Sequence, residues 1–204
     1  MTTTPETPDA AALLARQSAL QSAASAVLAD LDLLGTLGRV GRPIVVGSVA
    51  LGLMVWRDID LTTICPVLDP DQLFVLVRPL ASHPRIARLE CRIEIGPYNR
   101  DPALPDGLYW GLHYRADDRA TWQLDLWFLR EGTRQGDLDH LETLPARLTP
   151  ETRLAILWIK GLWAQLPAYR TQVRSVDIYD AVLDHGVRTP NEFRAFLEGR
   201  DRPS

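Results

Sequence analysis

The most constraining feature of the sequence is a change of periodicity along the chain, from helical to strand-like and back to helical. Apolar residues recur at helical spacing over residues 10–34. Five short segments then follow that are apolar or alternating and are bounded by glycine, proline or polar turns: 43–47, 59–65, 85–95, 107–114 and 121–129. This order predicts an α+β fold with a mixed, mainly antiparallel five-stranded sheet flanked by helices.

Further helices are predicted between and after the strands. Short helices are expected at 48–53 and 71–80, and a polar connection at 131–147. Thr149 is a capping residue followed by proline, which predicts the start of a helix. Helices are expected from there at about 150–165, 175–184 and 189–199. The chain is therefore expected to have three parts: a disordered N-terminus (1–8), a main domain (9–147) and a C-terminal helical segment (148–204).

The composition is that of a soluble globular protein, with 46% hydrophobic and 24% charged residues. A net charge of −4 argues against a dedicated nucleic-acid binder, although it leaves a local basic patch open. No apolar run approaches the roughly 20 residues of a membrane span, and no secretory signal is recognisable. Cys65 and Cys91 are expected to be buried free thiols. We therefore expect a cytoplasmic protein without a membrane partner.

Two aspartates, Asp58 and Asp60, lie two residues apart at the start of a predicted strand. Because side chains alternate along a strand, both carboxylates should lie on one face, with Ile59 turned into the core. Adjacent carboxylates repel each other unless a cation neutralises them. Paired hard oxygen ligands suit Mg²⁺ or Mn²⁺, which are often bound together with substrate phosphates.

A glycine–serine pair, Gly47 and Ser48, follows the preceding strand and opens a predicted helix. Glycine allows a phosphate to approach the backbone, and the first N–H groups of a helix attract anions. The hydroxyl of Ser48 adds a hydrogen-bond donor. The sequence therefore predicts a phosphate cradle shortly before the paired aspartates.

These residues together resemble the signature of the DNA polymerase beta-like nucleotidyltransferase superfamily. That signature has Gly-Ser after the first strand, a short gap, and then acid–apolar–acid on the second strand; here Ser48 and Asp58 are separated by nine residues. The superfamily adds a third carboxylate on a later apolar strand, and Asp125 matches it as the only charged residue between Thr121 and Leu129. The resemblance identifies 9–147 as a nucleotidyltransferase catalytic domain.

The resemblance also implies roles for these residues. Gly47 and Ser48 would grip the β- and γ-phosphates of a nucleoside triphosphate such as ATP. Asp58 and Asp60 would coordinate its metal ion, and Asp125 would join them at a second metal or act as general base on the acceptor hydroxyl. The implied reaction is displacement at the α-phosphate with release of pyrophosphate.

Lys160 is the only lysine of the chain. The segment 157–164 is similar to the Ile-Lys-x-x-Trp-Ala helix of poly(A) polymerase-like members, in which the lysine contacts the triphosphate. The alternative is a lysine that extends to solvent from an amphipathic helix. Among other candidates, Arg57, Glu90, Glu94 and His113 are expected to be structural or solvated.

The resemblance predicts a magnesium-dependent transferase that moves a nucleoside monophosphate to a hydroxyl of a small molecule, a protein or tRNA. The acidic net charge favours a small-molecule or protein acceptor, and a toxin–antitoxin or RNA partner stays open. The alternative is an inactive nucleotide-binding or regulatory module of the same fold. A third hypothesis is an unrelated mixed α/β domain whose acids bind a structural cation. A separation of more than about 8 Å between Asp58, Asp60 and Asp125 would support it and exclude the nucleotidyltransferase.

Overall fold

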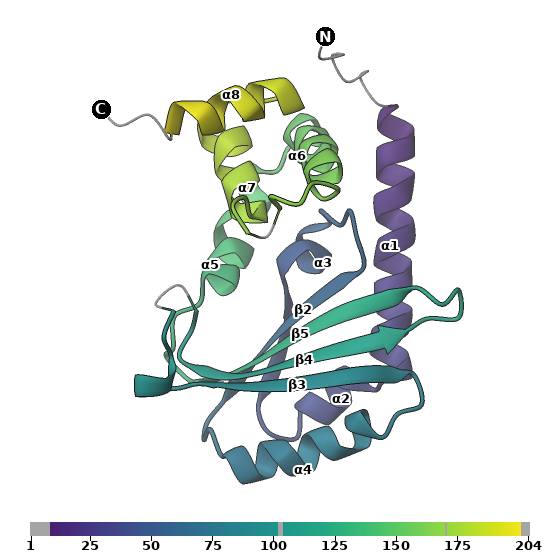
Figure 1. Cartoon of the computed structure of the whole chain (residues 1–204), viewed down its shortest axis with the longest axis vertical. Coiled ribbons are helices and arrows are strands. Elements are labelled where there is room, and N and C mark those ends of the chain that lie inside the picture. The colour runs from purple at the N-terminus through teal and green to yellow at the C-terminus, as the bar shows by residue number, and fades with distance from the viewer. Residues whose placement is uncertain (1–8, 102–103, 170, 201–204) are drawn as a thin grey trace. The chain divides into compact units, whose positions relative to one another are not determined.

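A computed structural model describes residues 9–101, 104–169 and 171–200, so the expected disorder of 1–8 lies outside the described residues. Five strands and eight α-helices are defined in this part of the chain (Figure 1). The elements are α1 Ala10–Asp30, α2 Leu33–Leu37, β1 Arg42–Val46, α3 Gly47–Leu51, β2 Asp58–Cys65, α4 Pro70–Ala81, β3 Ile86–Glu94, β4 Gly107–Arg115, β5 Thr121–Arg130, α5 Gly136–Thr143, α6 Pro150–Trp163, α7 Ser175–Asp184 and α8 Pro190–Arg200, with 3₁₀ turns η1 Gly96–Tyr98 and η2 Pro145–Arg147.

The five strands form one sheet in the order β1-β2-β5-β4-β3. Only β2 and β5 are parallel, and the other neighbours are antiparallel. This confirms the predicted mixed, mainly antiparallel five-stranded sheet, and every predicted strand lies within one residue of the observed bounds.

The chain divides into two compact units. The unit that contains the sheet, called here the sheet unit, comprises Gln21–Gly52 and Arg57–Thr143. The other, called here the helical unit, comprises Met1–Leu20, Leu53–Trp56 and Leu144–Ser204. The C-terminal part of the helical unit begins after residue 143, and the sequence analysis expected a boundary after residue 147. The helical unit also includes two segments from earlier in the chain.

The two faces of the sheet differ sharply in polarity. One face is apolar and buried, and its largest members include Trp110, Trp122 and Phe128, each at most 1% exposed. Burial of such side chains stabilises a fold by roughly 1.5–3 kcal/mol each. The opposite face carries half-exposed polar side chains such as Gln123 and Asp125, because side chains alternate along β5. We call this side, which bears Asp58, Asp60 and Asp125, the triad face.

The helical segment predicted at 10–34 is interrupted, which corrects the sequence analysis. Helix α1 ends at Asp30, and α2 begins at Leu33 after Asp32, which adopts a left-handed conformation (φ 42°). Gly35 permits this turn, because a Cβ there would meet the Asp32 carboxylate. The turn buries Leu33 completely, and the gain in apolar burial offsets the conformational strain.

Two smaller expectations also differ from the structure. The polar connection 131–147 contains α5, whose start is fixed by a hydrogen bond between the buried side chains of Thr62 and Gln135. Cys65 is buried as predicted, but Cys91 is only half-buried and accepts a hydrogen bond from Trp110 Nε1 at 3.0 Å. Among the described helices, none is both long and apolar enough to cross a bilayer.

Candidate metal centre

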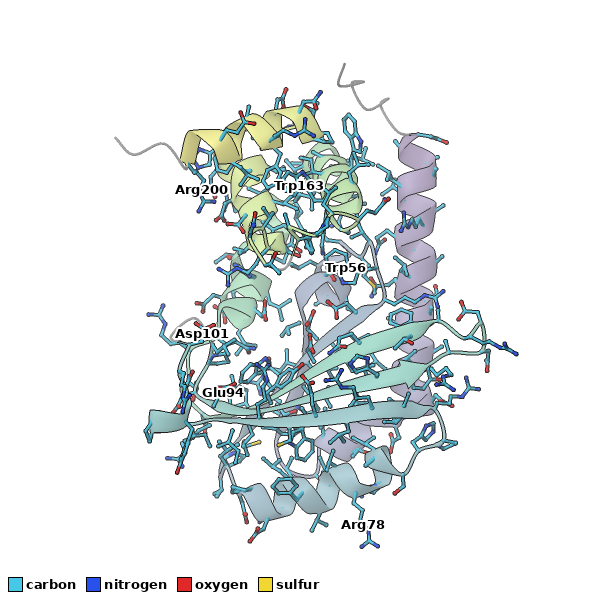
Figure 2. The ribbon with its side chains drawn as sticks, in the orientation of Figure 1. Trp56, Arg78, Glu94, Asp101, Trp163 and Arg200 are labelled. Atoms are coloured by element: carbon cyan, nitrogen blue, oxygen red, sulfur yellow. The ribbon has the colours of Figure 1, made fainter. Side chains whose placement is uncertain are left out.

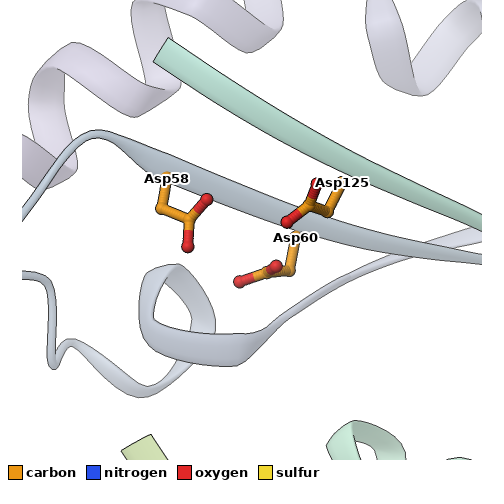
Figure 3. A group of neighbouring side chains, drawn as sticks. All are labelled: Asp58, Asp60 and Asp125. Atoms are coloured by element: carbon orange, nitrogen blue, oxygen red, sulfur yellow. The ribbon is translucent and has the colours of Figure 1, made fainter. Parts of the chain in front are cut away.

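Asp58, Asp60 and Asp125 form a cluster on the triad face (Figure 3). One carboxylate oxygen from each lies within 4.8 Å of the others. Asp58 is buried, whereas Asp60 and Asp125 are half-buried. The parallel pairing of β2 with β5 places Asp60 directly opposite Asp125, and the two-residue period brings Asp58 to the same face. The separation of more than about 8 Å that would have supported an unrelated α/β domain is therefore not observed.

The cluster has the composition of a site for a hard cation. Three carboxylates at this separation repel one another, and a divalent ion between them would remove that repulsion. Oxygen ligands without histidine or cysteine are the set preferred by Mg²⁺ and Mn²⁺ rather than by zinc. The three residues thus fit a divalent metal in both geometry and chemistry.

Asp125 is held by two side chains that the sequence analysis did not identify. Tyr109 Oη donates a hydrogen bond to Asp125 Oδ1 at 2.5 Å, and Gln123 Nε2 donates to the same oxygen at 2.9 Å. Burial, followed by the nearby Asp125 charge, raises the pKa of Tyr109 well above its usual value. Tyr109 therefore keeps its proton at neutral pH and remains a donor to the carboxylate.

The surroundings of Tyr109 fix its position. The guanidinium of Arg92 lies 4.0 Å from the centre of the Tyr109 ring, a cation–π distance. Gly111 lies opposite Asp125 in the sheet, and a Cβ at Gly111 would come within 2.8 Å of the Tyr109 hydroxyl. The absence of a side chain at Gly111 is therefore what gives the tyrosine hydroxyl room to reach Asp125.

Gly47 and Ser48 lie beside the aspartates within the sheet unit. Gly47 is the first residue of α3 and has a φ of +62°, which favours glycine. A Cβ at Gly47 would overlap the carboxylate of Asp60, so the backbone here passes directly against the cluster. Ser48 follows in α3 and is only 6% exposed. The predicted phosphate cradle and the predicted metal ligands are therefore neighbours.

Lys160 belongs to the helical unit, whereas the three aspartates belong to the sheet unit. Its side chain is 1% exposed, and Nζ donates hydrogen bonds to Leu53 O at 3.1 Å and to Tyr179 Oη at 3.4 Å. Nζ also lies 4.9 Å from the ring centre of Trp56. The alternative of a lysine extending to solvent is wrong, because α6 buries this side chain, and the phosphate contact stays a prediction.

The remaining candidates have other partners or surroundings. Arg57 makes a two-pronged ion pair with Asp118, at 2.9 and 2.6 Å, which accounts for its charge without a phosphate. Glu90 pairs with Arg88 at 3.0 Å. His113 is half-buried on the triad face, opposite Gln123 of β5.

No family model and no curated protein match this chain. Two solved structures are similar at a low level: CdnC from E. coli MS115-1 in complex with HORMA-deltaN, and the same CdnC with ATP. They share 16% and 14% sequence identity with the chain over 90% of its length, with TM-scores of 0.49 and 0.47. The chain spans 64% and 66% of the two matched chains, slightly under two thirds. Similarity at this level does not establish a shared activity.

Proposed function

We propose that this protein is a metal-dependent nucleotidyltransferase, which moves a nucleoside monophosphate from a nucleoside triphosphate to a hydroxyl acceptor and releases pyrophosphate. The observation that carries the proposal is the convergence of Asp58, Asp60 and Asp125, which come from two strands and lie within 4.8 Å of one another. The adjacent Gly47 adds a second element, because its backbone lies directly against the Asp60 carboxylate and so brings the start of α3 beside the cluster, where a phosphate on the metal would meet it.

Asp58, Asp60 and Asp125 would hold Mg²⁺ or Mn²⁺. When bound, the ion would neutralise charge on the triphosphate and on the oxygens that attack and leave at the α-phosphorus. The protein's own contribution is a fixed set of carboxylates. Asp125 is fixed by Tyr109 and Gln123, which both donate hydrogen bonds to its Oδ1. This leaves Oδ2 as the oxygen that we assign to the metal or to the acceptor proton.

The acceptor would approach over the triad face on the side of β4. In the reaction, the acceptor oxygen forms a bond to the α-phosphorus, the bond from the α-phosphorus to the bridging oxygen breaks, and pyrophosphate leaves with that oxygen. The hydroxyl proton passes to Asp125 or to solvent. Beyond Asp125 this face carries His113 and Glu90, polar side chains that an acceptor would meet. The acidic charge of the chain, −4, favours a small-molecule or protein acceptor.

The test is release of pyrophosphate from each of the four nucleoside triphosphates, with Mg²⁺, with Mn²⁺ and with EDTA. We expect release that requires the metal and that stops in EDTA. A thermal-shift series with the same ligands runs in parallel. Stabilisation by metal and nucleotide without any turnover, across a panel of acceptors, would favour the inactive nucleotide-binding module. Absence of both turnover and binding would refute the proposal.

Tyr109→Phe should weaken metal binding without unfolding the protein. The change removes one hydrogen bond to Asp125 and keeps the ring against Arg92. Loss of a residue that orients a metal ligand typically lowers metal affinity roughly 10–100-fold. Mn²⁺ affinity can be measured by electron paramagnetic resonance of the free ion. Tyr98→Phe, at a 70% exposed tyrosine of the same unit, is the matched control. Equal affinity in both variants would contradict this role.

A further inference from the structure

Strand β3 is the last strand of the sheet, and its outer edge is unpaired within the part of the chain that the structure describes. It is nine residues long and contains neither proline nor lysine, two of the devices that usually protect an edge strand. Ile93 on this strand is 50% exposed. The strand does carry four charged residues and a register irregularity near its start, which also protect an edge, so a further strand can pair with it only if that strand complements its charges.

The regular part of β3 is Arg88–Glu94, because a register irregularity lies between Ile86 and Arg88. Its sequence is Arg-Leu-Glu-Cys-Arg-Ile-Glu, and its midpoint is Cys91. Basic and acidic residues alternate on the triad face, while Leu89, Cys91 and Ile93 lie on the opposite face. Read in reverse, the segment keeps its apolar positions and exchanges every basic residue for an acidic one.

This pattern makes β3 complementary to a second copy of itself. In an antiparallel pair centred on Cys91, Arg88 lies opposite the partner's Glu94 and Glu90 lies opposite the partner's Arg92. On the other face, Leu89 lies opposite the partner's Ile93. By the two-fold symmetry each of these pairs occurs twice. Opposite charges and apolar residues at directly facing positions stabilise an antiparallel pair by roughly 0.2–1 kcal/mol each.

The present partners of these charges would not prevent such pairing. Arg88 and Glu90 form an ion pair along the strand at 3.0 Å, and Arg92 and Glu94 form another at 3.6 Å. The two arginine side chains are 63% and 45% exposed. The Arg88–Glu90 ion pair is exposed and contributes little to stability, so its side chains can turn to a strand alongside. Arg92 stays over the Tyr109 ring and would meet the partner's Glu90 from that position, and Glu94 is 13% exposed. Glu94 lies near the end of β3 (Figure 2), where it would face the start of the partner's regular segment.

We propose that two copies of this chain associate through their β3 strands, antiparallel and centred on Cys91, and so join their two sheets into one. Self-association is favoured over an unrelated peptide because the order of charges is complementary to its own reverse at all four charged positions. The two-fold axis runs perpendicular to the sheet, since an antiparallel pair keeps like faces on the same side. Both triad faces therefore lie on one side of the joined sheet.

Sedimentation of the full chain over roughly 1–100 µM, with Arg88→Glu and the double variant Arg88→Glu/Glu94→Arg, tests this register. We expect the wild type to reach twice the chain mass of 22.8 kDa. Arg88→Glu places two glutamates opposite each other at two symmetric positions and should weaken the dimer roughly tenfold. The double variant restores opposite charges across the interface and should restore the dimer, although it leaves like charges side by side along each strand.

Arg39→Glu, an exposed change next to α2 in the same unit, is the matched control and should leave the dimer intact. Helix α2 contacts β1 at the other edge of the sheet. Circular dichroism checks that each variant is folded, which is expected for the exposed Arg39 and Arg88 and needs to be shown for Glu94, whose side chain is 13% exposed. A wild type that stays monomeric at the highest concentration overturns the proposal. So does a dimer that Arg88→Glu leaves unchanged, or one that the double variant fails to restore.

Discussion

Asp60→Asn and Asp125→Asn should each reduce the rate of metal-dependent pyrophosphate release roughly a thousandfold. This is the size of effect expected when one electrostatic contact to the transition state is removed. Each change keeps the size of the side chain and removes one negative charge from a cluster whose oxygens lie within 4.8 Å. The fold should persist, because removing one of three like charges reduces their mutual repulsion in the absence of metal. The measurement is the rate of release, together with Mn²⁺ affinity of the same preparations.

Asp71→Asn is the matched control, since it makes the same chemical change at an exposed residue in the first turn of α4. It should retain wild-type turnover and Mn²⁺ affinity. A triad variant that binds Mn²⁺ as tightly as the control would argue that the cluster is not the metal site. Full turnover in both triad variants would place catalysis elsewhere.

The sheet could be predicted because each strand has a local sequence pattern of its own. Alternation or apolar runs bounded by turn residues fixed the strands to within one residue, including the β4–β5 hairpin. The break at Asp32 could not be predicted, because it depends on the burial of Leu33, which only the folded unit provides. Helix α5 was missed for the same reason, since its start depends on the bond between Thr62 and Gln135, far apart in sequence.

The candidate site divides in the same way. Asp58 and Asp60 share a face because of the two-residue period, and the resemblance, together with the isolation of Asp125 in an apolar strand, made Asp125 the candidate for a third ligand. Tyr109 could not be found from the sequence, because its approach to Asp125 depends on the register between β4 and β5 and on the missing side chain at Gly111. Register between strands is a tertiary property, which no local pattern specifies here.

Gly47→Ala should disable the site while leaving the protein folded. Gly47 has a φ of +62°, so alanine there costs roughly 1–2 kcal/mol in backbone strain. The larger effect is steric, because the new methyl group would overlap the carboxylate of Asp60 and push either the carboxylate or the start of α3 away. A displacement of about 1 Å in a catalytic group can lower the rate roughly a hundredfold. Pyrophosphate release and Mn²⁺ affinity should therefore both fall.

Gly96→Ala separates this steric effect from the strain. Gly96 also has a positive φ, +54°, but a Cβ there would meet nothing within 4 Å. Gly96→Ala should lose only the unfolding free energy of the backbone penalty in urea, whereas Gly47→Ala should lose at least as much, because it adds the overlap with Asp60. Only Gly47→Ala should lose metal affinity and turnover. If the two variants behave alike in turnover, the contact between Gly47 and Asp60 has no part in the reaction, and the glycine serves only to let the chain turn from β1 into α3.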